Sequence, residues 1–484
     1  MAGPTVLALD IGTSSVRASI YDRRPNALST TQLRYKLDEH QDGRVEIDPL
    51  ALERVTMQAI DRVLASRPGP VQAVATAAFW HSLMGVDAGN IPVTPLLPWS
   101  DLRAHGEVAR LRTLADERRA HARTGCRFHA SYWPARWLWY RRRDARTLRR
   151  VARWVGFTDW LERRWLGRDG VSISQASGTG VLDQDACAWD RRLLEICGVD
   201  PASVAPLVDT DCEEGELRPQ LARRWPALAR ARWVPAVGDG ALNNLGAGCV
   251  RRGRAALMIG TSGAVRVLWQ PAPDERVVTG FGLWRYRLDR RRVVVGGALS
   301  NGGNAREWVL RICRAPAGIE RAAAGMPPDS HGLTMIPYFA GTRSPDYLPY
   351  ARAALAGLSL ATTPAQLLRA TMEAIAYRFA LVVRELEQVA AVREVVAAGG
   401  ALERSPAWVQ IIADVLGRRI QMCRPRELTS GGAAALALDR LGEADLSRLR
   451  PVVDRTIVPD QANRRTYDRA LERHVRFAAD VAGF

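Results

Sequence analysis

Residues 233–263 read WVPAVGDGALNNLGAGCVRRGRAALMIGTSG and hold two glycine-bounded turns, each preceded by a short apolar run. In the first turn, at 238–240 (GDG), glycines flank the Asp239 carboxylate and let a ligand approach the backbone closely. The second turn, at 260–263 (GTSG), offers backbone N–H groups and hydroxyls to phosphate oxygens. A carboxylate near an anion-binding turn indicates phosphoryl transfer, with Asp239 accepting the proton of an attacking hydroxyl. The alternative is that Asp239 only shapes a turn or caps a helix.

The GTS pattern also occurs near the N-terminus. Residues 9–17 read LDIGTSSVR and residues 258–266 read MIGTSGAVR, and an apolar run lies on each side of both. Two strand–turn–strand hairpins about half a chain apart predict a duplicated architecture with a nucleotide between the halves. Asp10, at the end of the first strand, is placed to hold Mg²⁺, through water. Ordinary turn chemistry of Asp and Thr is the alternative for this hairpin.

The composition bounds the kind of protein. With 484 residues, 47% hydrophobic and 25% charged, the chain has room for two to three globular domains. No apolar run approaches the ~20 residues that span a bilayer. The N-terminal residues lack the charged segment of a signal peptide, so we expect a cytoplasmic location. The seven cysteines are widely spaced without C-x-x-C, which predicts reduced thiols rather than disulfides or a zinc site.

The net charge of +17 comes almost entirely from arginine, because Lys36 is the only lysine among 68 basic residues. A P-loop requires Gly-Lys-Ser/Thr, and Lys36 lies in no such sequence, so a nucleotide site here must be of another kind. The arginines are spread along the chain, with local crowding at residues 140–154. Dispersed charge is more often a solvated surface than a nucleic-acid site, so we expect no nucleic-acid partner.

Strand and helix patterns alternate through both halves, which predicts two α/β domains. Helices are expected at residues 48–65, 133–150, 156–165, 305–314, 363–389, 405–416 and 464–482. Strands are expected at residues 71–78, 265–269, 280–286, 292–295, 335–339 and 395–398, and a loop of small residues at 174–180.

Three expected strands end in segments suited to ligands. His81 follows strand 71–78 and is a candidate for contacting a polar substrate, with a buried structural histidine as the alternative. The loop 296–304 (GGALSNGGN) leads into a helix whose N-terminal end suits an anion or a nucleotide edge. Residues 399–401 (GGA) follow strand 395–398 and would let an adenine ring lie flat against the backbone.

Together these segments resemble a known family. The matching pieces are 10–14 (DIGTS) with Arg17, 81–82 (HS), 99–103 (WSDLR), 238–240 (GDG), 259–263 (IGTSG), 301–303 (NGG) with Trp308, 341–345 (GTRSP) and 399–401 (GGA). In this order, over about residues 6–438, they resemble the FGGY-type carbohydrate kinases of the actin and hexokinase superfamily. The resemblance implies an α/β fold of two actin-like (ribonuclease H-like) ATPase domains with a catalytic cleft between them. It places an N-terminal, sugar-binding domain at 1–246 and a C-terminal, ATP-binding domain at 247–484.

Within the family, the chain looks most like the gluconate kinases. Residues 79–87 (FWHSLMGVD) are similar to their A-M-H-S-L-x-x-V-D, and residues 238–246 (GDGALNNLG) to their S-D-G-x-x-x-N-L-G. The implied reaction is ATP- and Mg²⁺-dependent phosphorylation of D-gluconate to 6-phosphogluconate. The carboxylate of gluconate would need a cationic or donor partner, and His81 and His129 are the candidates. Trp80 stands where the family has Met and enlarges the side chain beside the sugar site.

The resemblance also implies the site residues. Asp239 is the catalytic base, and Asp10 and Asp239 bind the metal. Substrate-binding residues are His81, Ser82, His129, Asp239, Gly240 and Asn244. ATP-binding residues are Gly12, Thr13, Ser14, Arg17, Gly260, Thr261, Ser262, Gly302, Gly303, Gly399, Gly400 and Ala401.

Two other functions remain open from the sequence. One is a xylulokinase-like kinase acting on a pentulose or another polyol. The other is a non-catalytic sugar- or nucleotide-binding regulator of the same fold, which the presence of Asp239 argues against because a sensor needs no general base. The expected partner is a small-molecule sugar or sugar acid, without nucleic acid or membrane, and assembly into a homodimer stays open.

Overall fold

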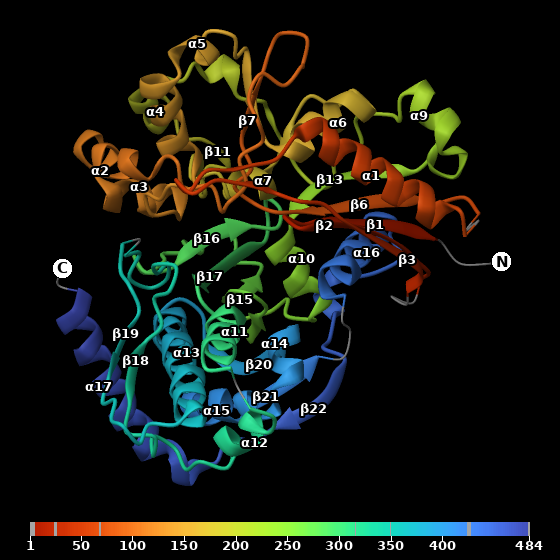
Figure 1. The fold of residues 1–484 in the computed structure, drawn as a ribbon. Helices are drawn as coiled ribbons and strands as arrows, with labels where there is room; N and C mark the ends of the chain where they lie inside the picture. Colours follow the sequence, from red (N-terminus) through yellow and green to blue (C-terminus); the bar gives the residue numbers. More distant parts are fainter. Residues whose placement is uncertain are drawn as a thin grey trace.

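The computed structural model describes residues 5–23, 27–66, 69–314, 316–348, 350–423 and 427–482. Residues 1–4, on which the expectation about a signal peptide partly rests, lie outside these ranges. Two mixed β-sheets, one from each half of the chain, form the centres of two lobes (Figure 1). Within the described ranges, no helix has both the length and the apolar character needed to cross a membrane.

The first sheet is built by the N-terminal half. Its order is β13-β6-β1-β2-β3, where β1 and β2 form the predicted N-terminal hairpin. β13 and β6 run parallel to β1, and β2 and β3 run antiparallel. The strands are β1 Val6–Ile11, β2 Ser15–Tyr21, β3 Ala27–Arg34, β6 Ala73–Ala78 and β13 Arg232–Gly238.

The second sheet repeats this plan. Its order is β22-β21-β20-β14-β15-β17-β16. β14, β20 and β21 run parallel to one another, and β15 runs antiparallel to both of its neighbours, β14 and β17. β14 and β15 therefore correspond to β1 and β2, which confirms the duplicated architecture predicted from the two GTS segments. The strands are β14 Gly253–Ile259, β15 Gly263–Trp269, β16 Trp284–Arg287, β17 Val293–Leu299, β20 Val392–Ala398, β21 Ile420–Cys423 and β22 Val453–Ile457.

The remaining elements cover and connect the sheets. In the first half the helices are α1 Pro49–Leu64, α2 His105–Leu114, α3 Glu117–Thr124, α4 Trp133–Arg143, α5 Ala145–Leu148, α6 Phe157–Leu166, α7 Ile173–Ser177, α8 Arg191–Cys197, α9 Pro219–Arg224 and α10 Asp239–Gly246. In the second half they are α11 Gly303–Ile312, α12 Ile319–Ala324, α13 Pro364–Glu387, α14 Gly400–Arg404, α15 Pro406–Leu416, α16 Leu428–Arg440 and α17 Arg464–Ala482. Short strand pairs are β4 Asp38–Glu39 with β5 Val45–Glu46, β7 Met84–Val86 with β8 Arg153–Val155, β9 Val171–Ser172 with β12 Leu207–Val208, β10 Leu182–Asp183 with β11 Ala188–Trp189, and β18 Thr334–Ile336 with β19 Ala354–Ala356.

Helices α10 and α16 pack against each other between the two sheets (Figure 1). α16 belongs to the second half of the sequence but packs on β1 and β6 of the first sheet. The two helices cross closely because glycines lie at the contact. A Cβ on Gly246 would overlap the carbonyl oxygen of Leu428, and a Cβ on Gly432 would overlap the carbonyl oxygen of Leu242. The two halves are thus joined by interlocked helices, and the domain boundary at residue 246 remains a prediction.

Several expected elements differ in the structure. The expected helix 133–150 is interrupted at Asp144, whose Oδ1 accepts from the N–H of Thr147 at 3.1 Å and starts α5. The expected loop 174–180 contains helix α7, capped by the Ser172 hydroxyl. The expected strands 280–286 and 335–339 shorten to β16 and β18.

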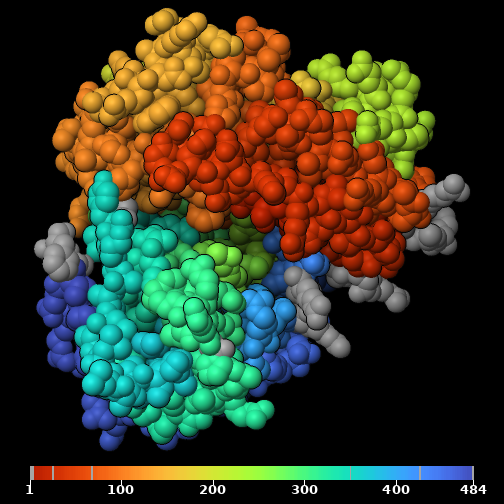
Figure 2. All heavy atoms as spheres, in the orientation of Figure 1, coloured from red at the N-terminus to blue at the C-terminus, as the bar shows by residue number. Residues whose placement is uncertain are grey.

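A hollow separates the N-terminal lobe from the C-terminal lobe on the face seen in Figure 2, and residues of α10 lie between the lobes (Figures 1 and 2). The hairpin tips β1–β2 and β14–β15 belong to different sheets. Each tip is closed by a backbone hydrogen bond of 3.0 Å. In the first hairpin the N–H of Gly12 donates to the oxygen of Ser15, and in the second the N–H of Gly260 donates to the oxygen of Ser262.

Candidate functional site

A cavity of about 250 Å³ lies between the halves and takes its walls from both. The first half contributes Trp80, His81, Trp99, His129, Ser131, Tyr132 and Asp239. The second half contributes Ser262, Gly263, Ala264, Arg266, Trp284, Tyr286, Ala298, Arg343 and Tyr347. Polar groups that converge in a concave, aromatic-lined space are typical of a small-molecule site.

Asp239 enters this cavity as the first residue of α10, directly after β13. Its Oδ1 accepts from the N–H of Gly240 at 2.7 Å. Burial raises the pKa of the Asp239 carboxyl above its ordinary value, while the charge of Arg266 and this hydrogen bond oppose the rise. A raised pKa brings a carboxylate closer to the range in which it works as a general base.

Trp80 fills the space behind Asp239. Its Nε1 donates to the oxygen of Ser174 at 2.8 Å, and a Cβ placed on Gly238 would lie less than 3.0 Å from three atoms of the indole. A Cβ on Gly240 would lie 2.6 Å from Trp80 Cζ3. The glycines therefore make room for the indole, and the open ligand approach that the sequence suggested for Gly238 and Gly240 is occupied by Trp80.

The two cavity histidines are neutral. Burial lowers the pKa of His81 and of His129 to about 3, and the charge of Arg343 acts in the same direction on both. His81 Nδ1 lies 2.5 Å from the oxygen of Gly178 and donates to it, and His129 Nδ1 accepts from the N–H of Ser131 at 3.2 Å. Neutral imidazoles can hydrogen-bond to hydroxyls, but they supply no positive charge for a carboxylate.

The positive charges of the cavity come from Arg266 and Arg343, neither of which the sequence analysis assigned to the substrate. Arg266 lies on β15, near Asp239, and its Nη1 donates to Asn243 Oδ1 at 3.5 Å. Both arginines stood in segments that matched the family, at 260–266 and 341–345, so position in the sequence alone gave no sign of their side-chain direction.

Three predicted substrate residues do not line the cavity: Ser82, Gly240 and Asn244. The Ser82 hydroxyl accepts from the N–H of Phe157 at 3.2 Å, on the side toward α6. Asn244 is buried and its Nδ2 donates to the backbone oxygen of Arg266 at 3.3 Å. Asn244 therefore supports the strand that carries Arg266 instead of touching the space for a sugar.

A second, larger cavity of about 610 Å³ adjoins the β14–β15 hairpin. The glycine segments predicted to hold ATP converge beside it. The N–H of Gly303 donates to the oxygen of Gly260, and that of Asn304 to the oxygen of Thr261, both at 3.0 Å. Its lining is Gly260, Thr261, Gly303, Asn304, Glu307, Trp308, Arg311, Phe339, Ala340 and Arg404.

The third glycine segment lies against the same hairpin. A Cβ on Gly399 would overlap the oxygen of Ile259, and one on Gly303 would lie 3.2 Å from the Cβ of Ala401. No atom of the described part of the chain lies within 4 Å of a Cβ built on Gly260, which leaves room for a ligand at this tip. Close backbone packing beside an open turn fits a nucleotide lying on the protein main chain.

Carboxylates gather at the β1–β2 hairpin. Arg17 Nη1 lies 3.3 Å from Asp10 Oδ2 and 2.5 Å from Glu427 Oε2, at the start of α16. Burial raises the pKa of Asp10 to about 7; Arg17 lowers it, and the nearby charges of Asp239 and Glu427 raise it further. Arg17, predicted to contact ATP, is therefore already paired with two carboxylates. A group of buried carboxylates whose ionised forms need a cation fits Mg²⁺, which prefers oxygen ligands.

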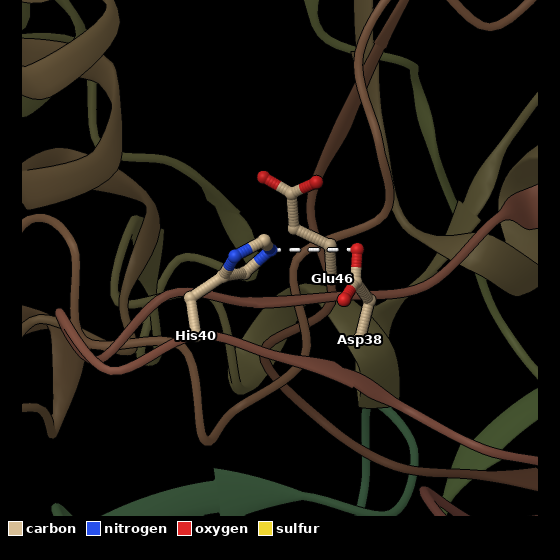
Figure 3. Close-up of side chains that lie close together, drawn as sticks. All are labelled: Asp38, His40 and Glu46. Carbon is tan, nitrogen blue, oxygen red and sulfur yellow. Dashed lines mark ion pairs between the residues drawn. The ribbon is translucent and has the colours of Figure 1, made fainter.

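Two other groups have the residue types of a metal site. Asp38, His40 and Glu46 lie together at the β4–β5 hairpin (Figure 3), where His40 Nε2 is 3.4 Å from Asp38 Oδ2. Glu46 is engaged by Arg103 at 2.6 Å. The buried group of Asp329, His331 and Glu373 is likewise neutralised, with Arg369 2.6 Å from Glu373. Both are explained as salt-bridge networks.

Comparison with known proteins agrees with this architecture. Residues 5–246 match the model of the N-terminal domain, and residues 255–439 that of the C-terminal domain, of the FGGY family of carbohydrate kinases. A gluconokinase from Bacillus subtilis is 25% identical over 458 residues, which cover 91% of this chain and 88% of the relative. A xylulose kinase from Streptomyces rubiginosus is 28% identical over 456 residues, covering 92% and 89%. The crystal structure of a gluconate kinase from Lactobacillus acidophilus superposes with a TM-score of 0.92 at 21% identity, covering 99% of this chain and 98% of that chain, which shows a shared fold.

Proposed function

The chain belongs to the FGGY family of carbohydrate kinases, and we propose that it phosphorylates a sugar acid, D-gluconate, to 6-phosphogluconate with Asp239 as the general base. The observation that carries this proposal is the charge pattern of the interlobe cavity, which combines one carboxylate, Asp239, with the guanidinium groups of Arg266 and Arg343. One positive charge is left over for the substrate, as a sugar acid requires. The gluconokinase relative supports the same substrate.

The position of Asp239 supports a role as the proton acceptor. It begins α10 beneath the cavity, where it can accept the proton of the terminal hydroxyl as that oxygen attacks. Its raised pKa, caused by burial, makes it a better proton acceptor than an exposed aspartate. Arg266 keeps the carboxylate ionised before the hydroxyl arrives, because its charge favours the anionic form. His81 and His129, both neutral, are suited to hold other hydroxyls of the sugar.

ATP and Mg²⁺ fit residues on the other side of Asp239. Gly260, Thr261 and Gly303 line the cavity beside the second hairpin and would hold the nucleotide. Asp10 and Asp239 would hold the metal ion, because burial and the nearby charge of Asp239 both raise the pKa of Asp10, and a cation would favour its ionised form. When bound, these groups supply the phosphoryl group and neutralise its charge. The chain's own contribution is to position the hydroxyl, receive its proton and exclude water from the cavity.

A pentulose kinase is the second candidate, because the xylulose kinase relative is as similar as the gluconokinase one. The two substrates differ in charge, and therefore in whether the cavity must supply an unpaired guanidinium group. A pentulose carries no charge and would leave the second guanidinium without a counter-ion, which is unfavourable in a buried site.

A coupled ADP-release assay over D-gluconate, D-xylulose, D-ribulose and glycerol tests the proposal. We expect kcat/KM to be highest for gluconate, and addition of EDTA to abolish turnover. A higher kcat/KM for xylulose, ribulose or glycerol would replace gluconate with that substrate and leave the carbohydrate-kinase assignment intact.

A further inference from the structure

We propose that the guanidinium group of Arg343 binds the carboxylate of the sugar acid. This inference rests on the proposed function and assigns a role that the sequence analysis gave to His81 and His129. It is supported by the partners of Arg343, by the surface around it and by its place in the cavity relative to Asp239.

Among the residues that the structure describes, Arg343 has no carboxylate partner. Its Nη2 donates to the backbone oxygen of Leu299 at 3.1 Å, while its buried Nε has no hydrogen-bond partner among the described residues. No carboxylate of the described residues forms an ion pair with it. An enclosed cation without an anion is costly, and a ligand that brings the anion removes that cost.

Several arginines that are more deeply buried than Arg343 are paired with carboxylates. Arg285 lies 2.8 Å from Asp185, Arg168 lies 2.8 Å from Glu162, and Arg369 lies 2.6 Å from Glu373. Arg136, which is fully buried, donates instead to the backbone oxygens of His81, Leu97 and Pro98. Unlike these four, Arg343 lines the cavity, whereas an unpartnered buried Nε is a feature that it shares with Arg136 and Arg285.

The surroundings hold the Arg343 side chain in place. The ring of Trp99 lies beside the guanidinium, 5.3 Å from its Cζ, and covers one side of it. Two backbone hydrogen bonds of 3.0 Å fix the loop that carries Arg343. The N–H of Ser344 donates to the oxygen of Ala298, and the N–H of Thr342 donates to the oxygen of Leu348. A planar fork held in a rigid loop is well suited to bidentate recognition of a carboxylate.

The charges are also ordered along the cavity in the way a sugar acid requires. Arg266 lies at the Asp239 end of the cavity, because a Cβ built on Gly240, next to Asp239, would lie 3.1 Å from its Nε. Arg343 lies instead beside Trp99, with its Cζ 5.3 Å from the centroid of that ring. A substrate with a hydroxyl at one end and a carboxylate at the other can place the hydroxyl at Asp239 and the carboxylate at Arg343.

The test compares D-gluconate with D-gluconamide, which keeps every hydroxyl and replaces the carboxylate with a neutral amide. Wild type, Arg343→Gln, Arg343→Lys and the surface control Arg393→Gln are assayed with saturating MgATP. In Arg343→Gln we expect kcat/KM for gluconate to fall about 10²-fold or more, mainly through KM, and kcat/KM for gluconamide to change less than about threefold. Arg343→Lys should lie in between, because lysine keeps the charge but loses the fork. The control should match wild type.

Three results would overturn the inference. If Arg343→Gln lowers kcat/KM equally for both substrates, Arg343 acts in phosphoryl transfer or folding, and gluconate remains the substrate. If the wild type does not distinguish gluconate from gluconamide, the carboxylate is not recognised. If the wild type phosphorylates only neutral sugars, both this inference and the gluconate proposal fail. Should Arg343→Gln not fold, as judged by circular dichroism, Arg343→Lys decides on the same comparison.

Discussion

The indole of Trp80 occupies the volume that a side chain at Gly238 would need. A Cβ at position 238 would lie less than 3.0 Å from three atoms of the ring. The ring cannot move aside freely, since its Nε1 donates to the backbone oxygen of Ser174 and its centroid lies 4.8 Å from that of the tilted Tyr286 ring. Trp80 and Gly238 thus form a coupled pair. The gluconate-kinase pattern that residues 79–87 and 238–246 resemble has Met and Ser at these two positions, so the two departures from it form one compensated change.

The first prediction follows from this pair. Gly238→Ser in the wild-type background should lower the free energy of unfolding by about 1–3 kcal/mol, because a side chain is forced into a filled space. In the Trp80→Met background the same substitution should be tolerated, because the smaller, flexible Met leaves room for it. Urea unfolding of wild type, both single variants and the double variant measures the coupling between the two sites.

Gly106→Ala in α2 is the matched control, because nothing lies within 4 Å of a Cβ built there. It should leave stability unchanged or raise it slightly, as alanine favours helices over glycine. Equal destabilisation by Gly238→Ser in the presence and absence of Trp80 would show that the two positions are independent.

The second prediction concerns the general base. Asp239→Asn should lower turnover about 10²–10⁴-fold, because the amide cannot accept the hydroxyl proton, while ATP binding changes little. Single-turnover phosphorylation and nucleotide binding are measured on the same preparations, so that loss of chemistry is separated from loss of folding. Normal turnover in the Asn variant would show that Asp239 is only a helix-start residue.

The repeated sheet and the convergence of the glycine segments were predictable from the sequence, because both depend on local patterns. LDIGTSSVR and MIGTSGAVR each specify a strand, a turn and a strand, and β1–β2 and β14–β15 form as expected. The glycines at 302–303 and 399–401 meet the second hairpin because all three segments follow strands of one sheet or start helices at its edge.

Side-chain direction and long-range partners could not be predicted. Asp239 was recognised from its flanking glycines, but these serve Trp80, which lies far away in the sequence. Asn244 follows Asp239 closely and was expected at the sugar, yet its place on α10 turns it toward the backbone of Arg266. Arg343 and Glu427 acquire their surroundings only when loops from distant segments meet, and no local pattern encodes that meeting.

The third prediction uses His474, which is buried in α17 with its ring 5.5 Å from that of Tyr377. Burial, together with the charges of Arg378 and Arg473, lowers its pKa in the folded protein to about 3 from the ordinary 6.5. The folded state therefore holds this histidine neutral, whereas the unfolded state takes up a proton below pH 6.5. Its contribution to stability is fully present above that pH and is lost as the pH falls toward 3.

His474→Phe removes this proton uptake while filling a similar volume. Between pH 7.5 and pH 5.0, the wild type should lose about 2 kcal/mol more unfolding free energy than the variant, since each pH unit below 6.5 corresponds to about 1.4 kcal/mol for one proton. Urea midpoints at the two pH values give the difference. Parallel pH profiles for wild type and variant would show that His474 does not take up a proton on unfolding.

The last prediction concerns movement of the two lobes. Thr13 and Thr261 lie on hairpins of different sheets, and both are predicted to contact the phosphates of one nucleotide. One polyphosphate can be held from both sides only if the lobes approach each other, which would also exclude water from the reaction. The crossing of α10 and α16 would remain fixed during this motion, because the contacts at Gly246 and Gly432 leave no room for sliding.

Small-angle scattering measures the change directly. We expect the radius of gyration to stay unchanged with gluconate alone and to fall when gluconate and a non-hydrolysable ATP analogue with Mg²⁺ are both present, since closure needs contacts from both hairpins. Asp239→Asn is a useful second protein, because it should close in the same way with true ATP while reacting slowly. Gly432→Ala, in which the added methyl group would overlap the oxygen of Leu242, should disturb the crossing and weaken closure. Identical scattering profiles for the free protein and the complex with both ligands would show that the lobes do not move, and that the two hairpins reach the nucleotide without closure.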